Sequence, residues 1–106
     1  MNLHFTNQAS HEEIKSDEEV TCKRALELLH RLTAPKSTLI MRLPSGLGLD
    51  FELQQDGLLT VEFYEKEISN ASVSMEVAER IVKRAFEIKR DGAKELYADL
   101  IKNWNF

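Results

Sequence analysis

The sequence predicts an α+β domain in which a three- to four-stranded antiparallel meander is covered on one face by helices. Two observations predict this class: apolar and polar residues alternate without a break in the middle of the chain, and apolar stripes of helical spacing stand on both sides of that segment. The expected order is (β)-α-β-β-β-α-α. With 106 residues, of which 42% are hydrophobic and 30% charged, the chain has room for one domain, residues 1–106.

The first third of the chain predicts a strand followed by a helix. Leu3 and Phe5 alternate with polar neighbours, which indicates a short strand at a sheet edge. Ser16 is the expected N-cap of the helix, because Glu19 three residues later completes a capping box. Pro35 disfavours helical geometry at Ala34, so the helix is expected to end near Thr33. The helix has one apolar stripe, formed by Cys22, Ala25, Leu26, Leu29 and Leu32.

The central strand of the meander lies between two turn sequences, Leu43-Pro44-Ser45-Gly46 and Gln54-Gln55-Asp56-Gly57. Its residues alternate strictly, and those expected to face the core are Leu47, Leu49, Phe51 and Leu53. Residues directly opposite in an antiparallel pair project to the same side, so the loop length fixes which side chains share a face.

A three-residue loop in each turn keeps the two faces of the meander consistent. In the second turn, Gln55-Asp56-Gly57, it places Phe51 opposite Val61, whereas a two-residue loop would mix apolar and polar residues. Gly57 is then expected in the left-handed conformation that closes such a loop. The same rule applied to Pro44-Ser45-Gly46 places Leu39 opposite Phe51, and one sheet face becomes wholly apolar.

Two helices are expected after the meander. Residues 69–72 have the composition of a connection, and Ser74 is the expected N-cap of a helix that ends at Gly92. A second amphipathic segment, with Leu96 and Trp104 on its apolar side, runs toward the C-terminus. The wide apolar stripe of the first of these helices indicates packing against more than one neighbour.

The charge and composition of the chain limit the kinds of partner and the cellular location that we expect for it. The net charge is −4, and residues 1–67 carry seven Lys or Arg against twelve Asp or Glu. This balance repels nucleic acid and anionic membranes and favours a protein partner with a basic surface. The lone Cys22 excludes an intramolecular disulfide, and the chain shows neither a signal peptide nor a stretch of membrane-spanning length. We therefore expect a cytoplasmic protein, monomeric or weakly dimeric.

The polar face of the meander is the candidate partner-binding site. Its predicted binding residues are Asp50, Glu52, Glu62, Tyr64 and Arg42. The register places Asp50 directly opposite Glu62, an unfavourable like-charge pair, with Arg42 diagonal to Asp50. Ile40, Leu58 and Tyr64 lie among these acids and add apolar contact area. Two interpretations stay open: a solvated face that keeps the protein soluble, and a protein-binding face.

No catalytic or metal-binding motif stands out. Paired carboxylates can perform general acid and base catalysis, but a short open sheet offers little to separate their pKa values. His4, His11, His30 and Cys22 lack the spacing of a zinc site. We expect no catalytic residue, no metal and no cofactor, and a binding protein in place of an enzyme.

The stretch from Thr38 to Glu65, TLIMRLPSGLGLDFELQQDGLLTVEFYE, with helices on either side, resembles the small acidic immunity proteins that bacteria encode beside secreted toxins. The resemblance is one of size, acidity and layout. It implies an antitoxin that binds a cognate toxin, often a nuclease, and covers its active site with acidic side chains such as Asp50, Glu52 and Glu62. A second resemblance is to small acidic secretion chaperones, which dimerise through a helix. A small enzyme is the third alternative.

Overall fold

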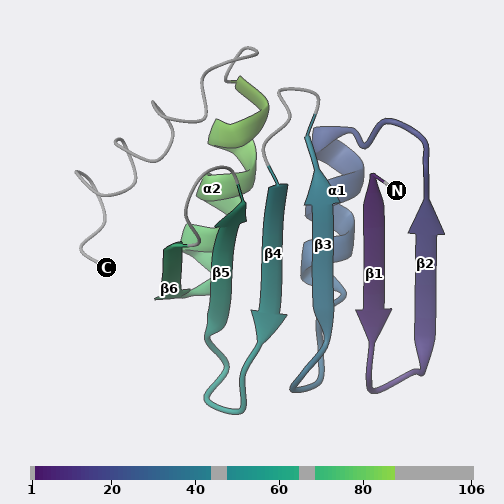
Figure 1. Cartoon of the computed structure of the whole chain (residues 1–106). Helices are drawn as coiled ribbons and strands as arrows, with labels where there is room; N and C mark the ends of the chain where they lie inside the picture. Colours follow the sequence, from purple (N-terminus) through teal and green to yellow (C-terminus); the bar gives the residue numbers. More distant parts are fainter. Residues whose placement is uncertain (1, 44–47, 65–68, 88–106) are drawn as a thin grey trace.

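The protein folds as one six-stranded antiparallel sheet with two helices on one of its faces (Figure 1). The computed structural model describes residues 2–43, 48–64 and 69–87, and the side chains of residues 63, 64 and 69–71 are outside this description. Its elements are β1 (Leu3–Asn7), β2 (Glu12–Ser16), α1 (Cys22–His30), β3 (Thr38–Arg42), β4 (Gly48–Leu53), β5 (Leu59–Tyr64), β6 (Ser69–Val73) and α2 (Met75–Glu87). The spatial order is β2-β1-β3-β4-β5-β6.

The predicted α+β class is confirmed, but the sheet is larger than predicted. The expected three or four strands are six, and the element order in the described residues is β-β-α-β-β-β-β-α. The two additional strands, β2 and β6, are the two edges of the sheet. As a result β1, which was expected at an edge, is an inner strand that pairs with both β2 and β3.

The hydrophobic core lies between the sheet and the helices. Each inner strand sends alternate side chains into it, and Phe5, Leu39, Leu49 and Phe51 are fully buried there. The helices contribute one apolar stripe each: Ala25, Leu28 and Leu29 from α1, and Ala78, Ile81, Val82 and Ala85 from α2. The helices also contact each other, so they form one layer over the sheet.

The register of the meander agrees with the prediction on both sides of β4. Leu39 and Val61 both lie opposite Phe51, one from β3 and one from β5. The loop before β5 is closed as expected, with Gly57 at a φ of 84° and its amide donating to the Gln54 carbonyl at 3.1 Å. The corresponding Pro44-Ser45-Gly46 loop, and Leu47 after it, fall outside the described residues.

The predicted start of the first helix is wrong. Ser16 is the last residue of β2, and its hydroxyl accepts a hydrogen bond from the Glu18 amide at 3.1 Å, which closes a local turn. The N-cap is Thr21, whose hydroxyl accepts from the Arg24 amide at 3.2 Å. The helix ends at His30, a few residues before Pro35, and Leu32 beyond it is still buried.

A second correction concerns residues 69–72, which belong to β6 and not to a connection. The next prediction is confirmed: the Ser74 hydroxyl accepts from the Val77 amide at 3.2 Å and caps α2. The expected helix end at Gly92 and the amphipathic segment with Leu96 and Trp104 lie outside the described residues.

Two buried polar side chains fasten the N-terminal hairpin to the rest of the fold. The Asn7 amide donates to the Arg31 carbonyl at 2.8 Å, and its oxygen accepts from the Ala9 amide at 2.9 Å. The fully buried Ser37 hydroxyl accepts from the Gln8 amide at 2.9 Å. These bonds satisfy polar groups that would otherwise be costly to bury, and they join the β1–β2 turn to the ends of α1 and β3.

Candidate protein-binding face

The sheet face that points away from α1 and α2 is the candidate site, and we call it the open face. Because side chains alternate along a strand, it carries the residues between those of the core. The members whose side chains are described are His4, Thr6, Glu13, Lys15, Thr38, Ile40, Arg42, Asp50, Glu52, Thr60, Glu62 and Ser72. One row of directly opposed residues crosses all six strands, in the order Lys15, His4, Ile40, Asp50, Glu62 and Asn70.

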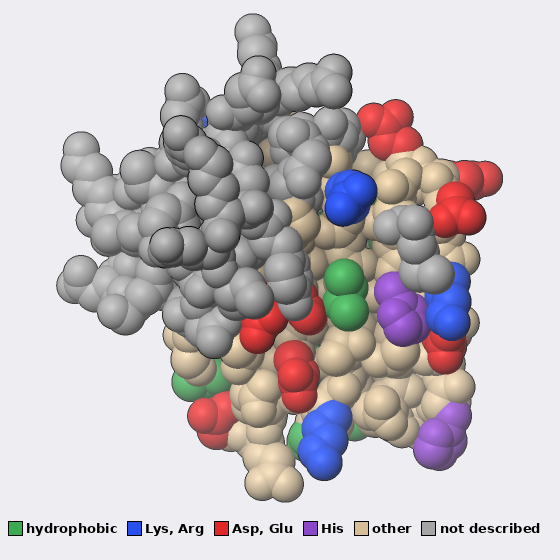
Figure 2. Space-filling model, in the orientation of Figure 1, with side chains coloured by type: hydrophobic (Ala, Val, Ile, Leu, Met, Phe, Trp, Pro, Cys, Tyr) green, Lys and Arg blue, Asp and Glu red, His purple; other side chains and the backbone are tan. Residues whose placement is uncertain are grey.

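Three carboxylates lie together over β4 and β5, and we call Asp50, Glu52 and Glu62 the acidic half of the open face. Asp50 is directly opposite Glu62, as the sequence predicts, and both side chains are half-buried. Each of these two residues also has an interaction elsewhere in the chain. Figure 2 shows acidic side chains (red) gathered over β4 and β5, with a hydrophobic side chain (green) beside them over β3.

The apolar neighbour of the acidic half is Ile40. It lies directly opposite Asp50 on the β3 side, and 38% of its surface is exposed. Thr38, next to it along the face, is joined to Thr6 by a 2.8 Å hydrogen bond between their hydroxyls. Ile40 is thus an exposed apolar side chain bordered by acids and hydroxyls.

Arg42 and Tyr64 flank the acidic half at one end. Both pair with Gly48, Arg42 from β3 and Tyr64 from β5. Arg42 is exposed and lies diagonally across from Asp50, as predicted. The Tyr64 backbone has the predicted register, and its side chain lies outside the description. The five predicted residues therefore belong to neighbouring positions on three adjacent strands.

The other part of the open face, on β1 and β2, carries charges of both signs, and we call His4, Glu13 and Lys15 the mixed half. The Glu13 carboxylate is 2.9 Å from the Lys15 ammonium and 3.5 Å from the His4 ring nitrogen. The hydrogen bond and the positive charge of Lys15 lower the pKa of Glu13, with a smaller contribution from His4. Sequence reasoning missed this group because it placed residues 12–16 before a helix.

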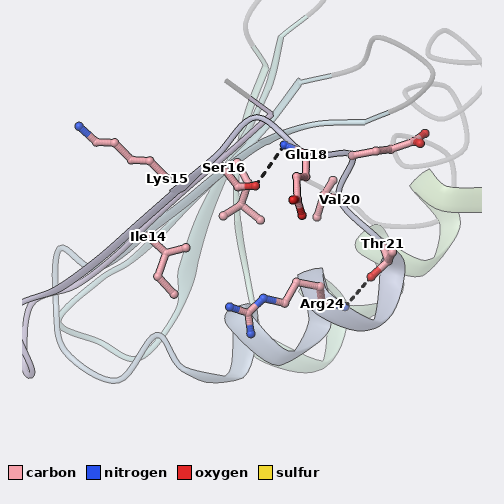
Figure 3. Close-up of a pocket in the computed structure, with 9 residues that line it drawn as sticks. Ile14, Lys15, Ser16, Glu18, Val20, Thr21 and Arg24 are labelled. Atoms are coloured by element: carbon pink, nitrogen blue, oxygen red, sulfur yellow. Dashed lines mark hydrogen bonds between the residues drawn. The ribbon is translucent and has the colours of Figure 1, made fainter.

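A hollow of about 530 Å³ lies between β2 and the start of α1 (Figure 3). Its apolar walls are Leu3, Ile14 and Val20, and Arg24 and Glu18 stand at its rim. Figure 3 shows Ile14 and Arg24 on facing sides of this hollow and Lys15 pointing away from it. The hollow exists because β2 extends the sheet beyond the width that α1 covers.

Three further findings complete the description of the site. Within residues 2–43, 48–64 and 69–87, no group of three or more His, Cys, Asp or Glu side chains could hold a metal ion. In the same residues, neither helix is long and apolar enough to cross a membrane. Comparison of the chain with known protein families, with curated proteins and with solved structures gave no match.

Proposed function

We propose that this protein is an immunity protein that binds and neutralises a toxin through the acidic half of its open face. The observation that carries the proposal is the direct opposition of Asp50 and Glu62, with Glu52 beside them, on the face that α1 and α2 do not cover. Like charges that lie directly opposite each other in a sheet repel by about 0.2–1 kcal/mol. A basic partner would turn this repulsion into attraction.

The surroundings of the acids fit a protein partner. Ile40 supplies an exposed apolar contact directly beside Asp50, and Arg42 supplies a donor for carboxylates or carbonyls at the edge. Charge on such a surface mainly raises the association rate and selects the partner, while the apolar contact slows dissociation. Nuclease toxins fit this chemistry because their active sites bind phosphates and are rich in basic side chains.

The secretion-chaperone alternative has less support. A chaperone of that kind needs an extended apolar groove for an unfolded client. The exposed large apolar side chains among the described residues are Ile40 and Leu58. They stand on β3 and just before β5, with β4 between them, and do not form a continuous groove.

The proposal is tested with the purified product of the reading frame next to this gene. We expect that product to be toxic when expressed alone and harmless when co-expressed with this protein. The purified pair should associate rapidly at low salt, and the association rate should fall as salt is raised. Absence of a complex between the two purified proteins at low salt would contradict the proposal.

A matched pair of variants locates the contact. Asp50→Lys combined with Glu62→Lys should slow association, because the steering field is reversed. Glu76→Lys combined with Glu87→Lys, a charge reversal of the same size on the exposed surface of α2, should leave the rate nearly unchanged. Equal effects of the two variants would show that net charge, and not the acidic half, guides binding.

A further inference from the structure

From the charge pattern of the edge strand β2 we infer that this protein forms a symmetric homodimer in which β2 pairs with β2 of a second copy. β2 is one edge of the sheet, and a described strand pairs with it on one side only. An edge strand presents a row of backbone donors and acceptors that can extend the sheet into another chain. This inference does not depend on the proposed function.

Symmetry restricts how two copies of β2 can meet. A two-fold axis perpendicular to the sheet makes the strands antiparallel and keeps both open faces on the same side. Residues that lie opposite each other across the junction must then project from the same face of the sheet. The axis therefore lies between one residue of β2 and the same residue of the second copy. The axis can lie at any of the three central residues of the strand, which are Glu13, Ile14 and Lys15.

Charge selects one of these three registers. An axis at Glu13 places Glu13 opposite its own copy, and an axis at Lys15 does the same for Lys15, so both registers oppose like charges. An axis at Ile14 places Glu13 opposite Lys15 of the second copy, and Lys15 opposite Glu13. Their side chains are 51% and 53% exposed, so both are available for a second interaction.

The neighbouring positions agree with the Ile14 register. On the helix side, the half-buried Ile14 meets Ile14 of the second copy, which removes an apolar edge from water. Glu12 comes opposite the Ser16 hydroxyl, and its charge is already matched by an ion pair with Arg31. Within β2, both opposed pairs on the open-face side of the junction, Glu13 with Lys15 and Lys15 with Glu13, therefore join an acid to a basic side chain.

The dimer would be a continuous twelve-stranded sheet with two acidic halves on the same side. The acidic half lies on β4 and β5, three and four strands away from β2, so the junction leaves it accessible. The second copy is the partner favoured over an unrelated strand because the sequence of β2 is complementary to itself.

The test is sedimentation velocity of the full chain over a range of concentrations, which we expect to show a monomer–dimer equilibrium with a Kd below about 1 mM. Lys15→Glu alone and Glu13→Lys alone should each raise the Kd by about tenfold or more, because each opposes like charges twice across the axis. The double variant Glu13→Lys, Lys15→Glu should restore the dimer, since the swap preserves every opposed pair. Arg80→Glu on α2 is the matched control and should leave the Kd unchanged.

Two results would overturn the inference. One is a wild-type chain that stays monomeric over the whole concentration range. The other is a dimer whose Kd does not respond to the single reversals, or that the double swap fails to restore. Circular dichroism of each variant confirms the fold, and these exposed substitutions are not expected to disturb it.

Discussion

On the acidic half of the open face Asp50 lies opposite Glu62, whereas on the mixed half the Glu13 carboxylate lies 2.9 Å from the Lys15 ammonium. The two pairs lie on the same face of one sheet. Asp50 and Glu62 are neighbours across two strands, and Glu13 and Lys15 are neighbours on one strand. The mixed half neutralises its charges within the chain. The acidic half concentrates charge of one sign, which supplies a long-range field that a basic partner can sense. We propose that the mixed half pairs with a second copy of the chain and that the acidic half binds a partner of opposite charge.

The largest effect is expected from adding a carboxylate to the side of the sheet that the helices cover. Leu49→Asp places a charge in the core next to Asp50, where Leu49 is fully buried. We expect the free energy of unfolding to fall by about 4 kcal/mol or more, which is enough to unfold a domain of ordinary stability. Urea denaturation followed by circular dichroism measures it.

The matched control for Leu49→Asp is Ile40→Asp, which adds a carboxylate to the open face directly opposite Asp50. It should remain folded and lose no more than roughly 1 kcal/mol from like-charge repulsion. A Leu49→Asp protein as stable as the control would contradict the assignment of the two faces.

The second effect concerns binding. Reversing both Asp50 and Glu62 to Lys should reduce the association rate with the basic partner by about tenfold or more at low salt, and by less as salt is raised. Stopped-flow fluorescence measures the rate. The same measurement on the swapped variant Glu13→Lys, Lys15→Glu should give the wild-type rate, since that change leaves the acidic half and the net charge intact.

The third effect is on stability and tests the two halves against each other. A double-mutant cycle with Asp50→Asn and Glu62→Gln should give an unfavourable coupling of about 0.2–1 kcal/mol between the two carboxylates. A cycle with Glu13→Gln and Lys15→Met should give a coupling of the opposite sign. Coupling energies of the same sign in the two cycles would contradict the view that charges repel in the acidic half and attract in the mixed half.

The smallest effect is a change in one titration. Lys15 lowers the pKa of Glu13, so Lys15→Met should raise that pKa toward its ordinary value. NMR titration of the Glu13 side-chain carboxyl measures the change. Because the pKa is lower in the folded state, Glu13 stabilises the fold above its unfolded pKa and loses this contribution as the pH falls through the folded pKa. A pKa unchanged by Lys15→Met would show that another group lowers it.

The inner strands could be predicted because each carries large apolar residues at every second position. β4 alternates without error, and the position of Gly57 fixes its register against β5. The same pattern predicts from the sequence that Asp50 lies opposite Glu62, which is the centre of the candidate site. Periodicity is a strong signal where one face of a strand is fully covered.

The edge strands could not be predicted because they bury too few apolar side chains to produce an alternating pattern in the sequence. β2 has a single large apolar residue, Ile14, and its helix side borders the hollow in place of a packed helix. Ser16 and Glu19 have capping-box spacing, which favoured a helix there, but the Ser16 hydroxyl closes a tighter turn. β6 has the composition of a loop, and only its pairing with β5 makes it a strand. Tertiary pairing overrides local preference at such positions.

The pairing of β1 with β3 has a consequence for synthesis of the chain. The β1–β2 hairpin is synthesised before β3, so the inner side of β1 has no strand to bond with until Thr38–Arg42 has emerged from the ribosome. During that interval the backbone groups of β1 and the Phe5 ring are exposed to other nascent chains. The length of chain between β1 and β3, which holds β2 and α1, therefore sets how much must be synthesised before β1 is covered.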